Sequence, residues 1–137
     1  GLLSAEKLYE STPSLEVLER VCSSGEPYCV DVWKTDIDGV DCTVLEILLR
    51  QVKPELLPKA MLLEVNTHFP PPFKFSISTI SGGLESRQDF WARQMQGLYG
   101  CSLSYQIAAL KDFGYWLIGF LHKDALFVHK SFAHAFN

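Results

Sequence analysis

YCVDVWKTDIDGVDCTVLEILL, residues 28–49, contains the change from strand to helix that decides the fold. Residues 29–33 are rich in strand formers, so residues 34–36 are expected at the carboxyl end of a strand. From Val40 onward the apolar residues fall at helical spacing, which predicts a helix with one face against an apolar partner, most simply a β-sheet. This stretch therefore predicts a strand, a charged turn and a helix.

Acidic residues gather where this strand is expected to end. In open α/β sheets, ligands bind outside the carboxyl ends of the strands, so Asp36 and Asp38 stand where a catalytic site is usually placed. Asp38 and Asp41 have a second interpretation, as residues that cap the helix and complement its dipole. Asp36 precedes the turn and is too early in the chain to act as a cap.

The composition predicts a single globular domain over residues 1–137, because 47% of the residues are hydrophobic and 12% are aromatic. A net charge of −4 without a basic cluster argues against nucleic acid and anionic membrane as partners, since both need concentrated Lys and Arg. No apolar run approaches the roughly 20 residues of a membrane span. We therefore expect neither nucleic-acid binding nor a membrane span.

The four cysteines show neither the paired spacing of a zinc site nor the density of a secreted disulfide scaffold. We therefore expect buried free thiols and an intracellular, reducing compartment. A disulfide between Cys22 and Cys29 is the alternative.

A second apolar run, AMLLEV at residues 60–65, predicts a buried strand. It is expected to be parallel to the first strand, because a helix connects the two. Glu64 and Asn66 lie at its end. We therefore expect a site between Asp36 and Asp38 on one strand and Glu64 and Asn66 on the next.

The rest of the chain predicts a loop, a helix and a hairpin. Three consecutive prolines interrupt residues 67–83, whose aromatic residues favour an ordered loop at the active edge. Ser102 is expected to cap a helix that Gly114 ends. Two apolar strands at residues 115–121 and 125–129 require an antiparallel hairpin, because their connection is short, and their aromatic residues are expected in the core. Further helices are predicted at residues 12–22 and 86–96.

The predicted order is helix, strand, helix, strand, long loop, helix, strand, strand. This order indicates an α/β fold, half of a doubly wound sheet closed by an antiparallel hairpin. An incomplete sheet of this kind exposes the edge of its first strand, and we expect the chain to self-associate there.

Three segments carry a resemblance to a known family. KTDIDGVDCTVLEILL, residues 34–49, resembles the segment after the fourth strand of FkbM-type methyltransferases, which are class I enzymes that use S-adenosylmethionine. LLEVN at residues 62–66 resembles the fifth strand, and GYWLIGFLHKDALFVHK at residues 114–130 resembles the closing sixth and seventh strands. EVNTHFPPPFKFS followed by YGCSLSYQ is similar to uncharacterised eukaryotic relatives of that family.

The resemblance implies the C-terminal half of a Rossmann-like class I methyltransferase sheet. Class I enzymes hold the cofactor with a glycine-rich loop after their first strand and an acidic residue after their second, and this sequence contains neither. The chain therefore resembles part of a larger domain. The resemblance implies that residues upstream of Gly1 complete the S-adenosylmethionine site.

The resemblance also implies roles for individual residues. It gives Asp36, Asp38 and Asn66 to the catalytic site, with Asp36 near the methyl group. The implied reaction is O-methyl transfer to a small-molecule or glycan-like hydroxyl substrate, with a carboxylate as positioning group or base. His68 has a second interpretation as a lone surface histidine. The implied substrate-binding residues are Glu64, His68, Phe69, Tyr99 and Ser102.

Two alternatives concern the chemistry and the class of function. Asp36, Asp38 and Asn66 offer oxygen ligands for Mg²⁺, as in the magnesium-dependent catechol methyltransferases that this arrangement resembles. The other interpretation of these residues is ordinary capping and solvated carboxylates. The chain is alternatively a non-catalytic interaction module that keeps a methyltransferase-like scaffold. The missing cofactor loop and the apolar, proline-rich residues 69–75 are its grounds.

Overall fold

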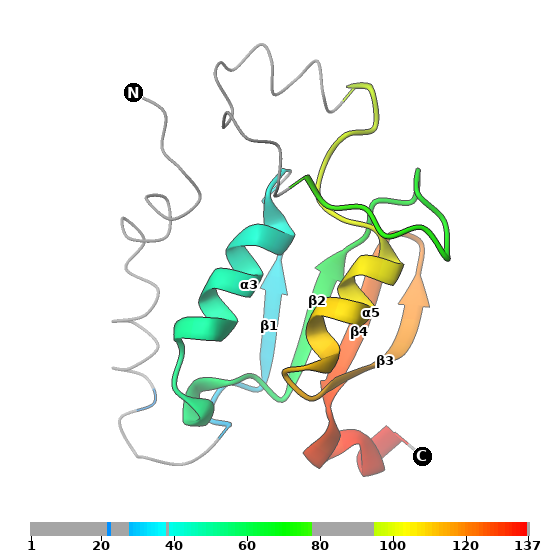
Figure 1. Ribbon diagram of the computed structural model, residues 1–137. Coiled ribbons are helices and arrows are strands. Elements are labelled where there is room, and N and C mark those ends of the chain that lie inside the picture. The colour runs from blue at the N-terminus through cyan, green and yellow to red at the C-terminus, as the bar shows by residue number, and fades with distance from the viewer. Residues whose placement is uncertain (1–21, 23–27, 38, 78–94, 137) are drawn as a thin grey trace, which may run out of the picture.

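The computed structural model describes residues 22, 28–37, 39–77 and 95–136. They form a four-stranded sheet with two α-helices on one face (Figure 1). The fold is therefore α/β, as the sequence predicts. In chain order the elements are β1 (Val32–Thr35), α3 (Asp41–Gln51), a 3-10 helix (Pro54–Leu56), β2 (Ala60–Glu64), α5 (Leu103–Lys111), β3 (Tyr115–Leu121), β4 (Asp124–His129) and a second 3-10 helix (Lys130–Phe136).

The strands lie in the order β1-β2-β4-β3. β1 and β2 are parallel and joined by α3, while β4 is antiparallel to both β2 and β3. The parallel pair and the antiparallel hairpin are thereby confirmed. The hairpin turns back so that the last strand, β4, lies between β2 and β3, and β4 alone runs against the other three.

Several local predictions are confirmed, but the first strand begins later than its composition suggests. β1 starts at Val32, opposite Ala60 at the start of β2, so the partner strand rather than the strand-forming run sets its beginning. The predicted helices at residues 12–22 and 86–96 lie outside the described residues, apart from Cys22 and the last two positions of the second.

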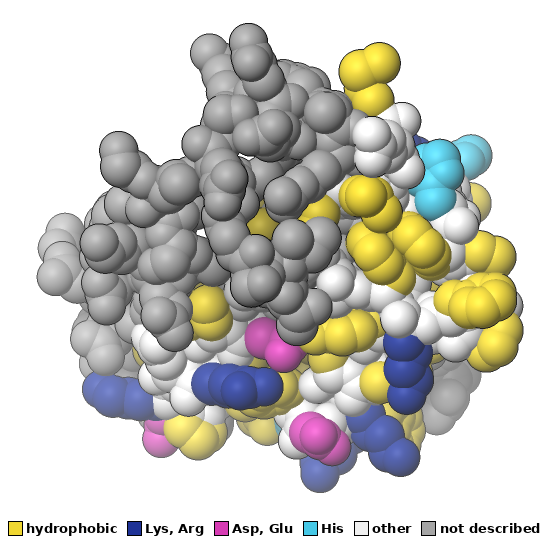
Figure 2. All heavy atoms as spheres, turned by 45° about the horizontal axis from the view of Figure 1, so that its top comes forward, with side chains coloured by type: hydrophobic (Ala, Val, Ile, Leu, Met, Phe, Trp, Pro, Cys, Tyr) yellow, Lys and Arg dark blue, Asp and Glu magenta, His cyan; other side chains and the backbone are white. Residues whose placement is uncertain are grey.

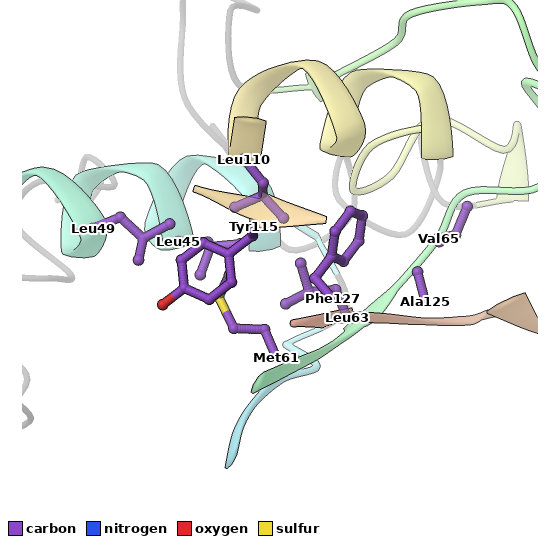
Figure 3. Close-up of a cluster of buried hydrophobic side chains, with 9 residues drawn as sticks. All are labelled: Leu45, Leu49, Met61, Leu63, Val65, Leu110, Tyr115, Ala125 and Phe127. Atoms are coloured by element: carbon purple, nitrogen blue, oxygen red, sulfur yellow. The ribbon is translucent and has the colours of Figure 1, made fainter. Parts of the chain in front are cut away.

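The core lies between the sheet and the two helices (Figure 3). Alternate residues of β2 and β4 point toward the helices, as expected for strands with one covered face. Tyr115 brings a hydroxyl into this core and donates it to the carbonyl oxygen of Pro58 at 2.6 Å, and its burial raises the pKa of the phenol. The buried residues of this core cluster are Leu45, Leu49, Met61, Leu63, Val65, Leu110, Tyr115, Ala125 and Phe127.

Not all aromatic residues of the hairpin are in the core, contrary to the sequence prediction. Trp116 and Phe120 on the edge strand β3 are 56% and 45% exposed. Trp116 lies opposite Val128, on the sheet face turned away from α3 and α5, which also exposes Val32 (61%) and Leu121 (70%). We call this face the open face. For Trp116 the prediction failed because hydrophobicity alone does not say which face of an edge strand the helices cover.

The prediction of free thiols is wrong, because all four cysteines form disulfides, Cys22 with Cys29 and Cys42 with Cys101. The two cysteines of the second pair are separated by 59 positions and come together only in the folded chain, so no local spacing in the sequence predicts this disulfide. An intracellular reducing compartment loses its basis, since disulfides persist in oxidising environments. In the described part of the chain, no helix is long and apolar enough to cross a membrane.

Candidate functional site

The loops that follow β1 and β2 meet the segment before α5 at one edge of the sheet, which we call the carboxyl edge (Figure 1). Backbone hydrogen bonds join them directly. The amide of Gly100 donates to the carbonyl of Gly39 at 2.6 Å, and the amide of Asn66 donates to the carbonyl of Cys101 at 2.8 Å. Ile77 donates to Gly100 at 3.1 Å. The predicted site residues are therefore carried by loops that hold one another in place.

Asn66 is a buried clamp between two of these loops, with 1% of its surface exposed. Its Nδ2 donates to the carbonyl oxygens of Gly97 and Tyr99 at 2.7 and 2.8 Å. Its Oδ1 accepts the amide of His68 at 2.9 Å. The amide side chain thus holds residues 97–99 against the end of β2, and both of its donor hydrogens are already engaged.

Ser102 is fully buried and caps α5, as the sequence predicts. Its Oγ accepts the amide of Tyr105 at 3.3 Å and that of Phe75 at 2.9 Å. The hydroxyl donates to the carbonyl of Phe73 at 2.8 Å. Ser102 therefore fixes the loop after β2 to the start of α5, and a substrate-binding role would have to compete with these bonds.

Asp41 is buried at the first position of α3, where it stabilises the turn rather than the free amides of the helix. Its Oδ1 accepts the amide of Ile37 at 2.7 Å, and its Oδ2 accepts the amide of Gly39 at 3.0 Å. The helix has no side-chain cap at Val40. The next residue, Cys42, is bonded to Cys101, so this turn is tied covalently to the segment before α5.

Asp36 is the predicted catalytic residue whose carboxylate is accessible, with 42% of its side chain exposed. It pairs with the Nζ of Lys34 at 3.1 Å. This hydrogen bond and the charge of Asp36 raise the pKa of Lys34, with smaller contributions from Asp124 and Glu64. Glu64 ends β2 opposite Asp124. Asp38 lies outside the described residues.

The aromatic candidates form two ring contacts at this edge. Phe69 stacks on Phe75 with ring centroids 3.9 Å apart. His68 meets Tyr99 edge to face at 6.1 Å, and the Nζ of Lys123 lies 6.0 Å from the Tyr99 ring. His68 is exposed and Tyr99 is half-buried, so a ligand can reach this second pair. Figure 2 shows hydrophobic side chains exposed over the described part of this side of the molecule.

The magnesium prediction stays untested, because one of its three ligands, Asp38, lies outside the described residues. The described residues contain no group of three or more His, Cys, Asp or Glu side chains that could hold a metal ion. The Oδ1 of Asn66 accepts a backbone amide, and Asp36 pairs with Lys34. These residues also lack a glycine-rich turn of the kind that holds S-adenosylmethionine, because the turn after β1 contains a single glycine, Gly39.

Two buried polar residues near this edge were not predicted. Thr35 ends β1, and the Nε2 of Gln106 donates to the carbonyl of Glu64 at 2.6 Å. The Oγ1 of Thr35 and the Oε1 of Gln106 are buried, and within the described structure neither has a hydrogen-bond partner. The sequence offered one weak signal, a glutamine beside the apolar stripe of the predicted helix.

At the carboxyl edge, the accessible carboxylate of Asp36 lies beside the cation of Lys34, and His68 and Tyr99 lie on the neighbouring loops. Such a carboxylate can accept a proton from a hydroxyl group or bind it by a hydrogen bond. Asn66 and Ser102 hold the loops that surround it. In comparisons with family models, curated proteins and solved structures, no match to this chain was found.

Proposed function

We propose that this chain supplies the substrate side of an S-adenosylmethionine-dependent methyltransferase that transfers a methyl group to a hydroxyl. The strand order carries the proposal. In this proposal, β1, β2, β3 and β4 correspond to the fourth, fifth, sixth and seventh strands of a class I domain. Their order, β1-β2-β4-β3 with β4 alone antiparallel, supports a parallel sheet closed by a reversed hairpin.

Asp36 is the proposed base or positioning group. It follows β1, at the sheet edge where ligands of open α/β sheets bind, and its side chain is accessible. A substrate hydroxyl held against this carboxylate would pass its proton to Asp36 as the hydroxyl oxygen gains the methyl group. Lys34 places a positive charge beside the reacting group.

S-adenosylmethionine supplies the electrophilic methyl group when it is bound. The described residues contain no glycine-rich turn after a strand, so the proposal gives cofactor binding to residues upstream of Gly1. What the described residues contribute is a rigid edge. The bonds of Asn66, Ser102 and Asp41 fix the loops around Asp36, and alignment of this kind is most of what a methyl transfer requires of its enzyme.

The test is methyl transfer by a chain extended upstream of Gly1, assayed with labelled S-adenosylmethionine and a panel of small hydroxyl compounds and glycans. Asp36→Asn should lower the rate about 100-fold or more, the usual effect of losing a general base. Asp31→Asn is the matched control, because Asp31 also pairs with a lysine, Lys59 at 2.6 Å, but lies ahead of β1. Equal rates for Asp36→Asn and the parent chain would refute the assigned role.

A chelator tests the magnesium variant in the same assay. Full activity in its presence would exclude a required metal, whereas activity that is lost and then restored by Mg²⁺ would revive the oxygen-ligand set. Binding of S-adenosylhomocysteine by calorimetry separates loss of the cofactor site from loss of Asp36. Failure of every extended chain to bind it would refute the methyltransferase proposal.

A non-catalytic interaction module is the second candidate, and the open face favours it. Val32, Trp116 and Leu121 are more than half exposed there. Large apolar side chains exposed to solvent are one feature of protein interfaces. A defined complex that survives Asp36→Asn but is lost in Trp116→Lys would support this candidate over catalysis.

A further inference from the structure

We propose that protonation of His129 releases the second 3-10 helix from the sheet, from Ser131 onward. Figure 1 shows this helix at the end of the sheet opposite the carboxyl edge, where β1, β2 and β3 begin and β4 ends. We call this end the amino edge. The inference goes beyond the proposed function, because it concerns the end of the sheet that lies away from Asp36.

The ring of His129 is enclosed at the amino edge, with 5% of the residue exposed. It contacts two tyrosine rings, whose centroids lie 4.8 Å away for Tyr28 and 5.2 Å away for Tyr115. Gly114 closes a further side, since a Cβ there would lie 2.9 Å from the Nε2 of His129. The ring therefore has little room to turn while the edge is folded.

The hydrogen bonds of His129 require the neutral ring. Its Nδ1 accepts the amide of Ser131 at 3.3 Å. A ring nitrogen that accepts a hydrogen bond carries no proton, so the neutral ring holds its proton on Nε2, which lies 3.5 Å from the hydroxyl oxygen of Tyr28. Protonation would add an N–H at Nδ1, directed at the N–H of Ser131. Two donors would then face each other, and the bond to Ser131 would be lost.

The charges around His129 also oppose a protonated ring. Burial, and then the positive charge of Lys130, lower the pKa of His129. The carboxylate of Asp31 is engaged by Lys59, at 2.6 Å from its Nζ. In the described part of the chain, no carboxylate forms a hydrogen bond or an ion pair with the ring. The charged and titratable residues on the elements that contact the ring are Tyr28, Asp31, Lys59, Asp112, Tyr115, Lys130 and His134.

The ring of His129 also supports the aromatic contact on which the second 3-10 helix rests. Phe132 meets Tyr28 edge to face, with ring centroids 5.0 Å apart, and the Nζ of Lys59 lies 5.8 Å from the centroid of the Phe132 ring. Tyr28 itself lies against His129. Short 3-10 segments have little stability of their own, because their hydrogen-bond geometry is poor. Movement of the His129 ring therefore weakens the attachment of the whole segment.

The release should begin at Ser131 and leave β4 in the sheet. The amide of Lys130 donates to the carbonyl of Gly114 at 2.8 Å, and the amide of His129 donates to the carbonyl of Lys59 at 2.9 Å. Neither backbone bond involves the imidazole ring. We therefore expect a local opening of residues 131–136 rather than an unfolding of the hairpin.

Hydrogen exchange measured by NMR, on the chain with both disulfides formed, tests the release. A released ring titrates near its ordinary pKa of about 6.5, so the open form gains at most about 30-fold between about pH 7.5 and about pH 5. After correction for the intrinsic pH dependence of exchange, the protection of the amides of residues 131–136 should fall about fivefold or more. At both pH values these amides should be less protected than those of Met61 and Phe127 in the core.

Two histidine variants separate the role of the ring from other effects of acid. His129→Asn keeps an acceptor for the amide two residues on but does not titrate, so its protection at residues 131–136 should change less than about twofold between the two pH values. His134→Asn is the matched control. It removes an exposed histidine of the same helix and should keep the response of the parent chain.

The tautomer of His129 gives a second measurement in case His129→Asn does not fold. The nitrogen NMR shifts of the parent ring near neutral pH should place the proton on Nε2. A proton on Nδ1 would overturn the proposal, because Ser131 would then have no acceptor there. Equal protection of residues 131–136 at both pH values also overturns it, as does protection as high as that of the core, or a pH response that survives in His129→Asn.

Discussion

Removing the Cys42–Cys101 disulfide should destabilise this chain more than removing Cys22–Cys29. The first links residues 59 positions apart and the second links residues only 7 apart. A cross-link restricts the unfolded chain, and the restriction grows with the length of the closed loop. The chain-entropy model gives about 4 kcal/mol for the long loop and about 2.5 kcal/mol for the short one.

The folded state should add to this difference rather than reverse it. Cys42 and Cys101 are 5% and 0% exposed, so replacing both with Ala removes well-packed sulfur atoms and leaves small cavities. Cys22 is also buried at 7%, but its partner Cys29 is partly exposed. The backbone bond from Gly100 to Gly39 remains in either case and keeps the carboxyl edge from separating completely.

The assay is urea unfolding followed by tryptophan fluorescence, on the double variants C42A/C101A and C22A/C29A under non-reducing conditions. The free energies of unfolding should differ by about 1.5 kcal/mol or more, with C42A/C101A the less stable. Each single variant should lose most of the stability that its double variant loses, because either change breaks the bridge. An equal or larger loss in C22A/C29A would refute the reasoning from loop length.

Three further predictions test single residues. Asn66→Ala should cost about 2 to 3 kcal/mol in urea unfolding, because it leaves buried groups of two loops without partners, and a loss near zero would show that water replaces the clamp. Gly114→Ala should cost about 1 to 2 kcal/mol, because Gly114 has φ +81° and a Cβ there would lie 2.9 Å from the Nε2 of His129; an unchanged midpoint would contradict this. Burial, and then the charge of Lys130, lower the pKa of His129, so below about pH 6.5 the unfolded chain binds a proton that the folded chain does not. The free energy of unfolding should therefore decrease as the pH falls below this value, and His129→Gln should reduce that pH dependence.

The parts of the fold that depend on neighbouring residues could be predicted from the sequence. Ser102 supplied the cap of α5, whereas Gly114, which was expected to end that helix, lies three positions beyond its last residue, Lys111, at the end of the turn before β3. The apolar spacing after Val40 gave α3, and the short connection before Asp124 required an antiparallel hairpin. In each case the residues that determine the structure lie within a few positions of one another.

The parts that depend on distant residues could not be predicted. Nothing in the hairpin sequence says that β4 rather than β3 takes the place beside β2, since both strands are apolar. The pairing of Cys42 with Cys101 requires α3 and the segment before α5 to be already adjacent. The beginning of β1 was misplaced for the same reason, because Ala60 of the partner strand sets it.

The candidate site shows a related limit. The type of a residue determines which hydrogen bonds its side chain can make, but it does not determine which partners the fold places next to that side chain. Asn66 was correctly placed at the end of β2, yet its donors are taken by Gly97 and Tyr99, more than 30 positions further along the chain. The sequence therefore brought these residues to one edge of the sheet, but it did not show that the side chains of Asn66 and Ser102 are bonded within the fold.

Among the predicted catalytic residues that the structure describes, Asp36 differs from Asn66 in a way that bears on chemistry. Asn66 can contact a ligand only by releasing a buried loop, so its use would cost the stability of the edge itself. Among the described residues, Asp36 pairs with Lys34, in a surface pair that solvent screens, and exposed pairs of this kind contribute little to folding. A substrate hydroxyl can therefore replace Lys34 at the carboxylate without disturbing the loops, while the lysine stays close as a counter-charge. If the carboxyl edge is a catalytic site, its reactive group is Asp36, and its neighbours serve to hold that group in place.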